Sequence, residues 1–215
     1  ALRDVLSAFK AEGLPPPKEL IAAVDRDIKR LVGRQNWDGG FGFWRRGEDV
    51  WPFVTINAMH ALSRAKDKGF KVPDDTITNG MRYLRDIDRH IPWYYSREAR
   101  RAVQSYALYT LQRLGELDAK KAITVFDEAP LDDTQMETVA WLYPVLSAAA
   151  GKADPVAKNR LEATRRHLLN RVSEEAGTAH WTTSYGDSAY LLLASTIAAE
   201  ASPPPAPTPS PRSTR

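Results

Sequence analysis

The sequence of 215 residues contains no cysteine. Disulfides, thiolate metal sites, a catalytic thiol and a thioester built on cysteine are therefore excluded within it. Long apolar runs are missing as well. No stretch of roughly 18 apolar residues occurs, so we expect no membrane-spanning helix. A basic segment followed by an apolar one does not open the chain either, and we expect that it is not an intact secretory precursor.

A charge excess of one sign is also lacking. The 30 Lys and Arg residues face 27 Asp and Glu residues, which leaves a net charge of +3. Arginines cluster over 82–89, 97–101 and 165–166, but they alternate with acids or stand at helical spacing, as on a solvated helix face. A nucleic-acid footprint needs a stronger and one-sided positive charge. We therefore predict no nucleic-acid partner.

The residue patterns of common active sites are sparse. The four histidines are scattered, with no pair at i and i+4 and no carboxylates clustered beside them, so a zinc site is not expected. The strings G-x-S-x-G and D-x-D-D and a Gly-rich phosphate loop do not occur. The acid pairs at 74–75 and 132–133 stand at predicted helix starts, where the helix dipole accounts for them. We predict no catalytic, cofactor-binding or metal-binding residue.

Apolar stripes at helical spacing, separated by Pro and Gly, dominate the chain. Their 3.6-residue period predicts helices over 20–32, 54–65, 77–87, 103–114, 136–146, 157–172 and 189–199. Ser96 suits an N-cap, and Thr134 with Glu137 has the spacing of a capping box. Pro144 is expected to kink its helix. No segment alternates with period 2 for long, so strands are limited to short hairpin pieces.

Some of these helices follow a similar short loop, which indicates an internal repeat. FWRRGEDVWPFVTINAMHAL from Phe43 and HWTTSYGDSAYLLLAS from His180 both place a Trp element and a Gly–acid loop before a helix rich in small residues. Looser copies begin at Pro92 and Asp132. The helices of the four copies start near 52, 97, 135 and 188, at the spacing of one helix–turn–helix unit. We predict antiparallel helix pairs in an inner and an outer layer.

Proline gathers at the end of the chain. Six of the 15 prolines fall in residues 200–215, a segment with almost no side chain that could be buried. Such a composition cannot offset the entropy of ordering the chain. We predict one helical domain over 1–199 and a disordered Pro-rich tail over 200–215.

The sharpest motif is QNWDGGFGFW, residues 35–44. Its Asp-Gly-Gly centre is a turn signal, and its aromatic residues offer apolar area that would anchor the loop onto helix ends. We predict a structural clamp, so that Trp44→Ala would destabilise the fold by roughly 3–5 kcal/mol. The alternative is a binding edge or ligand site, with Trp44 exposed until a partner arrives. The residues of the predicted loop motif are Gln35, Asp38, Gly39, Gly40, Phe41, Gly42 and Trp44.

The pattern Q-x-x-D-G-G-F-G-x-W resembles the repeat loop of α/α-toroid proteins. These include terpenoid cyclases, protein prenyltransferase β-subunits and the thioester-containing domains of complement and α2-macroglobulin proteins. The flanks from Leu31 to Leu84 are similar to the thioester-domain segment of bacterial α2-macroglobulin-like proteins. They share an acidic–Trp helix entry at 49–51 and the string A-x-x-x-x-x-R-A-K-x-x-G-F-x-V-P across 58–73. A weaker similarity covers Ala179 to Leu193.

The resemblance implies an all-α fold, an α/α-toroid of antiparallel helix pairs that forms an incomplete ring here. It implies a non-catalytic interaction domain of an endopeptidase inhibitor that entraps proteases. The partners would be other domains of a longer chain and, through that chain, proteases. The location would be periplasmic, extracellular or in the cell envelope. The thioester of the family joins a Cys to a Gln, so this would be a thioester domain without its thioester.

Two other functions stay open. The first is an enzyme related to terpenoid cyclases or prenyltransferases, with an apolar cavity inside the ring. It is disfavoured because the D-x-D-D string is missing and because a prenyltransferase-like zinc site needs a Cys. The second is a generic helical-repeat scaffold with some other partner, which needs none of these residues. Flanking β-sandwich domains in the genomic sequence would favour the inhibitor.

Overall fold

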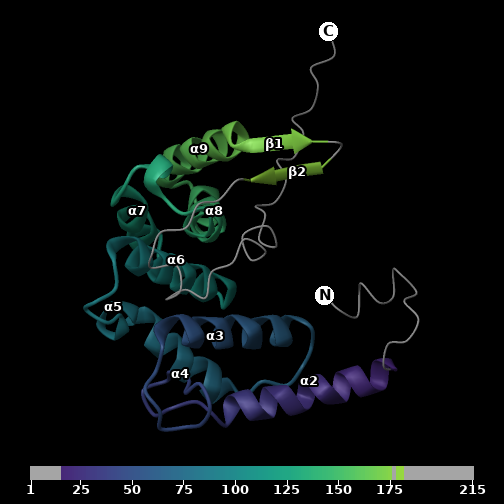
Figure 1. Cartoon of the computed structure of the whole chain (residues 1–215). Helices are drawn as coiled ribbons and strands as arrows, with labels where there is room; N and C mark the ends of the chain where they lie inside the picture. Colours follow the sequence, from purple (N-terminus) through teal and green to yellow (C-terminus); the bar gives the residue numbers. More distant parts are fainter. Residues whose placement is uncertain (1–15, 176–177, 182–215) are drawn as a thin grey trace. The chain divides into compact units, whose positions relative to one another are not determined.

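The computed structural model describes residues 16–175 and 178–181. This part of the chain contains eight α-helices and one 3-10 turn, followed by a two-stranded antiparallel hairpin (Figure 1). It divides into two compact units, with the boundary between Tyr83 and Leu84. The predicted all-α class is confirmed, and within the described ranges the strands are limited to a short hairpin, as the sequence predicts.

The first unit holds three helices and the long loop that joins the first two. They are α2 (Pro17–Val32), α3 (Pro52–Asp67) and α4 (Asp74–Arg85), whose last two residues lie beyond the boundary. Pro17 and Pro52 each begin a helix, at a position where the missing N–H would have no partner inside the helix. Gly80 on α4 lies against Met59 on α3, because a Cβ added to it would stand 2.0 Å from the Met59 sulfur. The two helices therefore pack closely at this point.

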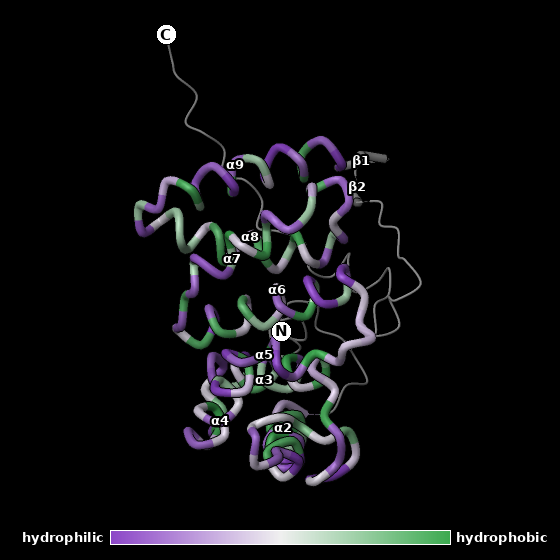
Figure 2. The backbone as a smooth tube through the Cα atoms, turned by 90° about the vertical axis from the view of Figure 1, so that its left-hand side faces the viewer, coloured by the Kyte–Doolittle hydropathy of each residue, from purple (hydrophilic) through white to green (hydrophobic). Residues whose placement is uncertain are grey.

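The second unit is built around α8. Its elements are α5 (Ile87–His90), α6 (Arg97–Arg113), α7 (Ala119–Asp127), η1 (Leu131–Asp133), α8 (Met136–Gly151), α9 (Pro155–Asn170), β1 (Val172–Glu175) and β2 (Thr178–Trp181). Helices α6, α7 and α9 all contact α8. Figure 2 shows α8 largely in green and white between α9 and α6, whereas α9 carries more purple, hydrophilic residues. The most apolar helix therefore packs against three others.

The core of this second unit comes from three helices. Six fully buried residues of α6, α7 and α8 form one cluster: Leu108, Ala122, Val125, Leu142, Val145 and Leu146. A smaller cluster joins α8 to α9 through Met136, Val139 and Leu168. Tyr106 of α6 stacks on Trp141 of α8, with ring centroids 4.4 Å apart. Burial of these side chains is the main force that holds the unit together.

Of the two predicted helix caps, one is confirmed and the other is wrong. Ser96 caps α6, because its Oγ accepts the N–H of Ala99 at 3.1 Å. The capping box at Thr134 is wrong, since α8 begins at Met136 without a side-chain cap. The Thr134 hydroxyl instead accepts a hydrogen bond from the buried Arg101 at 2.8 Å and donates to a backbone carbonyl. The hydroxyl that a capping box requires is therefore bonded to the side chain of a residue distant in sequence.

The helix starts of the predicted repeat agree with the structure. Starts expected near 52, 97 and 135 are observed at 52, 97 and 136. The fourth, near 188, lies outside the described residues, as do the stripe at 189–199 and the tail at 200–215. The division into one domain over 1–199 stays a prediction.

Some predicted boundaries are wrong. The stripe over 77–87 is interrupted, because α4 ends at Arg85 and a short α5 follows. The helix predicted over 157–172 also extends too far, since Val172 begins β1 and pairs with Trp181. The sequence patterns do not predict α7, which has only nine residues. The residue that could have indicated this helix is Asp118, whose carboxylate accepts the N–H of Lys121 at 2.9 Å as an N-cap.

His167 on α9 is a buried titratable group. Its side chain is 8% exposed, and its Nδ1 lies 3.5 Å from Oδ1 of Asp132. Burial, and after it the charge of Arg171, lowers the pKa of His167 below its ordinary value near 6.5, although Asp132 opposes this shift. The unfolded chain therefore binds this proton more readily than the folded chain. The contribution of the neutral ring is fully present above about pH 6.5, and it is lost as the pH falls from there through the lowered pKa of the folded state.

We expect the free energy of unfolding to decrease between pH 7 and pH 5.5 in the full 215-residue chain. The decrease should be smaller in His167→Gln, because the amide does not titrate. Urea unfolding at several pH values across this range measures both slopes. Equal slopes for the two proteins would contradict a lowered pKa at His167.

Candidate functional site

The candidate site is the segment of residues 35–51 between α2 and α3, called here the 35–51 loop. Two isolated antiparallel bridges pair Gln35 with Phe41 and Gly42 with Val50. The segment is therefore folded back on itself by backbone pairing, although it contains no regular strand. Its shape is fixed further by contacts with α3 and α4, which come from the motif residues.

The turn in this loop is the one that its Asp-Gly-Gly centre predicts. Oδ1 of Asp38 accepts the N–H of Gly40 at 2.9 Å, and the N–H of Gly39 donates to the carbonyl of Asn36 at 3.1 Å. Gly39 has a φ of +95°, which glycine adopts without a steric penalty. A Cβ at Gly39 would stand 2.1 Å from the carbonyl oxygen of Asn79. The turn therefore packs its bare backbone onto α4.

Gln35 ties this turn to the first turn of α4. Its side chain is buried, and its Nε2 donates to the carbonyls of Thr76 at 3.0 Å and of Gly39 at 3.2 Å. A buried amide side chain that bonds two backbone groups is satisfied by the contacts it makes. The sequence marks Gln35 as a motif residue, but the partner at Thr76 is 41 positions away and no local pattern indicates it.

Phe41 attaches the loop to α3. Its side chain is 1% exposed, and its N–H donates to Oγ1 of Thr55 at 2.9 Å. Gly40 and Gly42 on either side leave no room for a side chain, since added Cβ atoms would stand 2.7 Å from a Val50 methyl and 1.9 Å from a backbone carbonyl. The glycines therefore let the backbone approach closely while a single aromatic ring enters the core.

Glu48 holds the second half of the loop, and the sequence analysis missed it. Its Oε2 accepts the N–H groups of Trp44 at 2.8 Å and of Arg45 at 3.2 Å. The bond from the Trp44 N–H is the largest cause that lowers the pKa of the Glu48 carboxyl below its ordinary value. The Arg45 N–H and guanidinium lower it further, while partial burial opposes them. The sequence feature that could have indicated this role is an acidic residue four positions after Trp44 in a tight loop.

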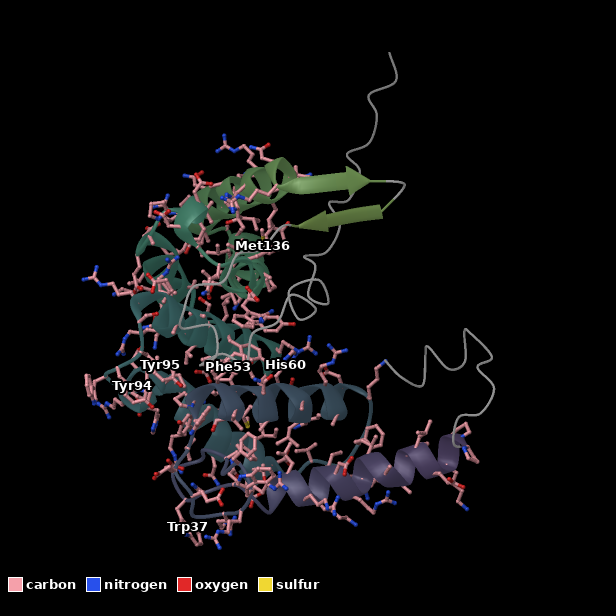
Figure 3. All side chains as sticks on the ribbon, viewed as in Figure 1. Trp37, Phe53, His60, Tyr94, Tyr95 and Met136 are labelled. Atoms are coloured by element: carbon pink, nitrogen blue, oxygen red, sulfur yellow. The ribbon has the colours of Figure 1, made fainter. Side chains whose placement is uncertain are left out.

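The expectation that Trp44 anchors the loop is wrong. Its side chain is 74% exposed, and Phe43 beside it is also exposed, with the two rings in edge-to-face contact at 4.8 Å between centroids. Trp37 is 87% exposed, and Figure 3 shows it on the outer side of the loop. Gln35, Gly39 and Phe41 hold the loop in place instead. The other aromatic residues therefore face solvent.

The structure thus brings four of the seven motif residues, Gln35, Gly39, Gly40 and Phe41, to the contact with α3 and α4. Asp38 and Gly42 make their contacts within the loop, and Trp44 stays outside. Across 16–175 and 178–181, no three His, Asp or Glu side chains gather in a way that could hold a metal ion. No helix in the same ranges is long and apolar enough to cross a membrane. The arrangement offers hydrogen bonds, aromatic surface and guanidinium groups, which are means of binding.

Helices joined by short connections, with a glycine-rich loop packed on the pair that follows it, place the chain in the all-α class. Alpha-2-macroglobulin of Escherichia coli K12 is 39% identical over 98 residues, which cover 43% of this chain and 6% of that protein. A cryo-EM reconstruction of native E. coli alpha-2-macroglobulin matches 75% of this chain and 10% of that chain, with a TM-score of 0.62 and 26% identity.

A crystal structure of trypsin-activated E. coli alpha-2-macroglobulin matches 67% of this chain and 10% of that chain, with a TM-score of 0.57 and 25% identity. No protein-family model matches the chain. The resemblance to bacterial α2-macroglobulins, predicted from the motif and its flanks, is confirmed. The chain spans only 6% of the length of the E. coli K12 protein.

Proposed function

We propose that the chain is a non-catalytic interaction domain of a longer protein similar to bacterial α2-macroglobulins. In this proposal the whole protein inhibits endopeptidases by entrapping them. The observation that carries it is the match to native E. coli alpha-2-macroglobulin over 75% of this chain, with a TM-score of 0.62. The activation of a matched relative by trypsin supports the link to proteases.

The proposed architecture is an incomplete α/α-toroid. Residues 1–199 would supply its antiparallel helix pairs, and residues 200–215 would take no part in it. Support comes from the helix starts at 52, 97 and 136, which keep the spacing of one helix pair. Contacts of α8 with α6, α7 and α9 are the kind of sequential packing that such repeats use.

The proposed role is mechanical rather than chemical. Without cysteine the chain cannot form the acyl thioester that a nucleophile would attack, so packing and steric obstruction are the means left to it. Its partners would be the other domains of the longer chain, and proteases would meet it only through the assembled protein. The proposed location is the periplasm, the cell envelope or the outside of the cell.

A two-substrate assay tests this function. The full-length protein, mixed with trypsin, should suppress cleavage of a large protein substrate and leave cleavage of a small chromogenic peptide largely unchanged. Entrapment blocks access to the protease without occupying its catalytic groups. The 215-residue chain alone, at the same concentration, is the matched control and should affect neither substrate.

Two results would contradict the proposal. One is a full-length protein that leaves cleavage of both substrates unchanged. The other is inhibition of peptide cleavage by the 215-residue chain alone, which would make it a direct inhibitor. Turnover of a prenyl diphosphate by the chain alone would favour the enzyme related to terpenoid cyclases.

A further inference from the structure

We propose that the exposed aromatic side of the 35–51 loop docks onto another domain of the longer chain. This surface, called here the tryptophan edge, consists of Trp37, Phe43, Trp44 and Trp51. The inference rests on the proposed function and adds to it the surface used and the chemistry of its partner. That partner surface would be apolar at its centre and would carry carboxylates around it.

The first argument is the composition of the edge. All four of its aromatic side chains are exposed, in one loop of the first unit. Phe43 and Trp44 are in edge-to-face contact, and tryptophan and arginine are enriched among the residues that dominate binding energy. An isolated exposed aromatic needs no explanation, but four on one short loop do.

The second argument is the fixed backbone beneath these rings. Arg34 donates to the carbonyl of Phe43, and Arg82 donates to the carbonyl of Trp37, both at 3.2 Å. The N–H of Trp44 is bound by Glu48. Because the backbone is already ordered, a partner that covers the rings loses little conformational entropy on binding. Pre-organised tryptophans are therefore efficient contact residues.

The third argument is the direction of the charges. Arg34, Arg46 and Arg82 bond to backbone carbonyls of the loop, and none of the three forms an ion pair with a described residue. The Arg46 guanidinium lies 5.3 Å from the centre of the Trp37 ring. Guanidinium groups have five donors and match carboxylates in a two-pronged geometry. Their remaining donors are therefore suited to carboxylates on a partner.

Two acids of the loop already have partners within it, although the charge of Arg34 also acts on Glu48. Asp38 accepts the N–H of Gly40 within its own turn, and Glu48 accepts two backbone N–H groups and pairs with Arg45. The negative charges thus bond inward to the backbone. Arg46 contacts the ring of Trp37 and Arg82 bonds its carbonyl, and both guanidinium groups keep further donors for an incoming surface.

A protein domain fits this edge better than an anionic membrane. The loop carries Arg45 and Arg46 against Asp38, Glu48 and Asp49, and Arg34 and Arg82 beside it bring the sum close to neutral. Recognition of anionic lipid takes clusters of about 4–8 basic residues, each contributing about 1 kcal/mol. A domain of the same chain would also be held nearby at high effective concentration. The chain spans only 6% of the length of its E. coli relative, which leaves ample room for such a domain.

Hydroxyl-radical footprinting with mass spectrometry tests the inference, because it reads the exposure of each tryptophan separately. Trp93 in the second unit is 90% exposed and serves as the internal reference. In the 215-residue chain, we expect Trp37 and Trp44 to be oxidised about as fast as Trp93. In the full-length protein, their oxidation should slow several-fold relative to the same chain alone. Equal rates for Trp37 and Trp44 in the two proteins would overturn the inference.

A charge-reversal variant tests the carboxylate part. Arg46→Glu combined with Arg82→Glu in the full-length protein should return the oxidation of Trp37 and Trp44 to the rate of the isolated chain. Arg30→Glu on the exposed side of α2 is the matched control and should leave both tryptophans protected. If the double variant stays as protected as the control, carboxylates do not contribute and this part of the proposal is wrong.

Two further arms separate the remaining outcomes. Vesicles of phosphatidylserine and phosphatidylcholine should leave the tryptophans of the 215-residue chain exposed, and their protection by vesicles alone would replace the domain with a membrane. The trypsin assay of the full-length protein is scored independently. Inhibition with an exposed edge overturns only this inference, whereas a covered edge without inhibition overturns only the proposed function.

Discussion

Gly39→Ala should destabilise the first unit by roughly 3–5 kcal/mol, near the upper limit for a single substitution. The positive φ of Gly39 accounts for about 1–2 kcal/mol of this loss in a residue with a Cβ. The larger part comes from the contact with α4, because the new Cβ would stand 2.1 Å from the carbonyl oxygen of Asn79. Helical backbone cannot yield by that much, so the turn must lift away. Urea unfolding of the full 215-residue chain measures the loss.

Gly47→Ala is the matched control for this experiment. Gly47 lies in the same loop with a φ of +89°, but an added Cβ would meet nothing within 4 Å. Only the cost of the positive φ applies at Gly47, so we expect the free energy of unfolding to fall by about 1–2 kcal/mol. Similar losses at the two positions would mean that backbone conformation alone decides the effect. The close approach to Asn79 would then have no energetic role.

Phe41→Ala should destabilise the chain by about 3–5 kcal/mol, as expected for truncation of a buried phenylalanine. The ring of Phe41 is 1% exposed, and its removal leaves a cavity beneath a loop that three glycines already hold close to the helices. Thermal melting of the wild type and the variant, run side by side, gives the shift in Tm.

Trp44→Ala is the comparison that makes this result informative. Trp44 is larger than Phe41 and lies three positions away, yet it is 74% exposed. Its removal should change the free energy of unfolding by no more than about 0.5 kcal/mol, as at most surface positions. A Tm for Trp44→Ala as low as that for Phe41→Ala would show that the exposed ring stabilises the fold after all.

These two aromatics illustrate what the sequence can and cannot predict. In a helix, the 3.6-residue period tells which side chains share a face, and the stripes over 20–32 and 54–65 locate α2 and α3 correctly. The 35–51 loop has no period. Composition therefore marks Phe41, Phe43 and Trp44 as equivalent, and only the path of the backbone decides which ring is buried.

Long-range contacts explain the other differences. The capping box fails at Thr134 because Arg101, 33 positions earlier, takes the hydroxyl. Helix α9 ends before Val172 because that residue pairs with Trp181 in the hairpin. In both cases the local pattern is typical of the predicted cap or helix. A contact with a residue outside that pattern determines the structure that forms. By contrast, the cap at Ser96 depends on a neighbour three positions away, and it is predicted correctly.

The 35–51 loop separates the residues that fix its shape from those that face outward. Gln35, Gly39 and Phe41 make the contacts with α3 and α4, whereas no hydrogen bond among the described residues uses the indole nitrogen of Trp37 or Trp44. Substitutions at the outward positions are therefore shielded from selection for folding. Such a loop can exchange its surface residues over evolution, and an engineer can graft a new binding sequence onto them, without altering the scaffold underneath.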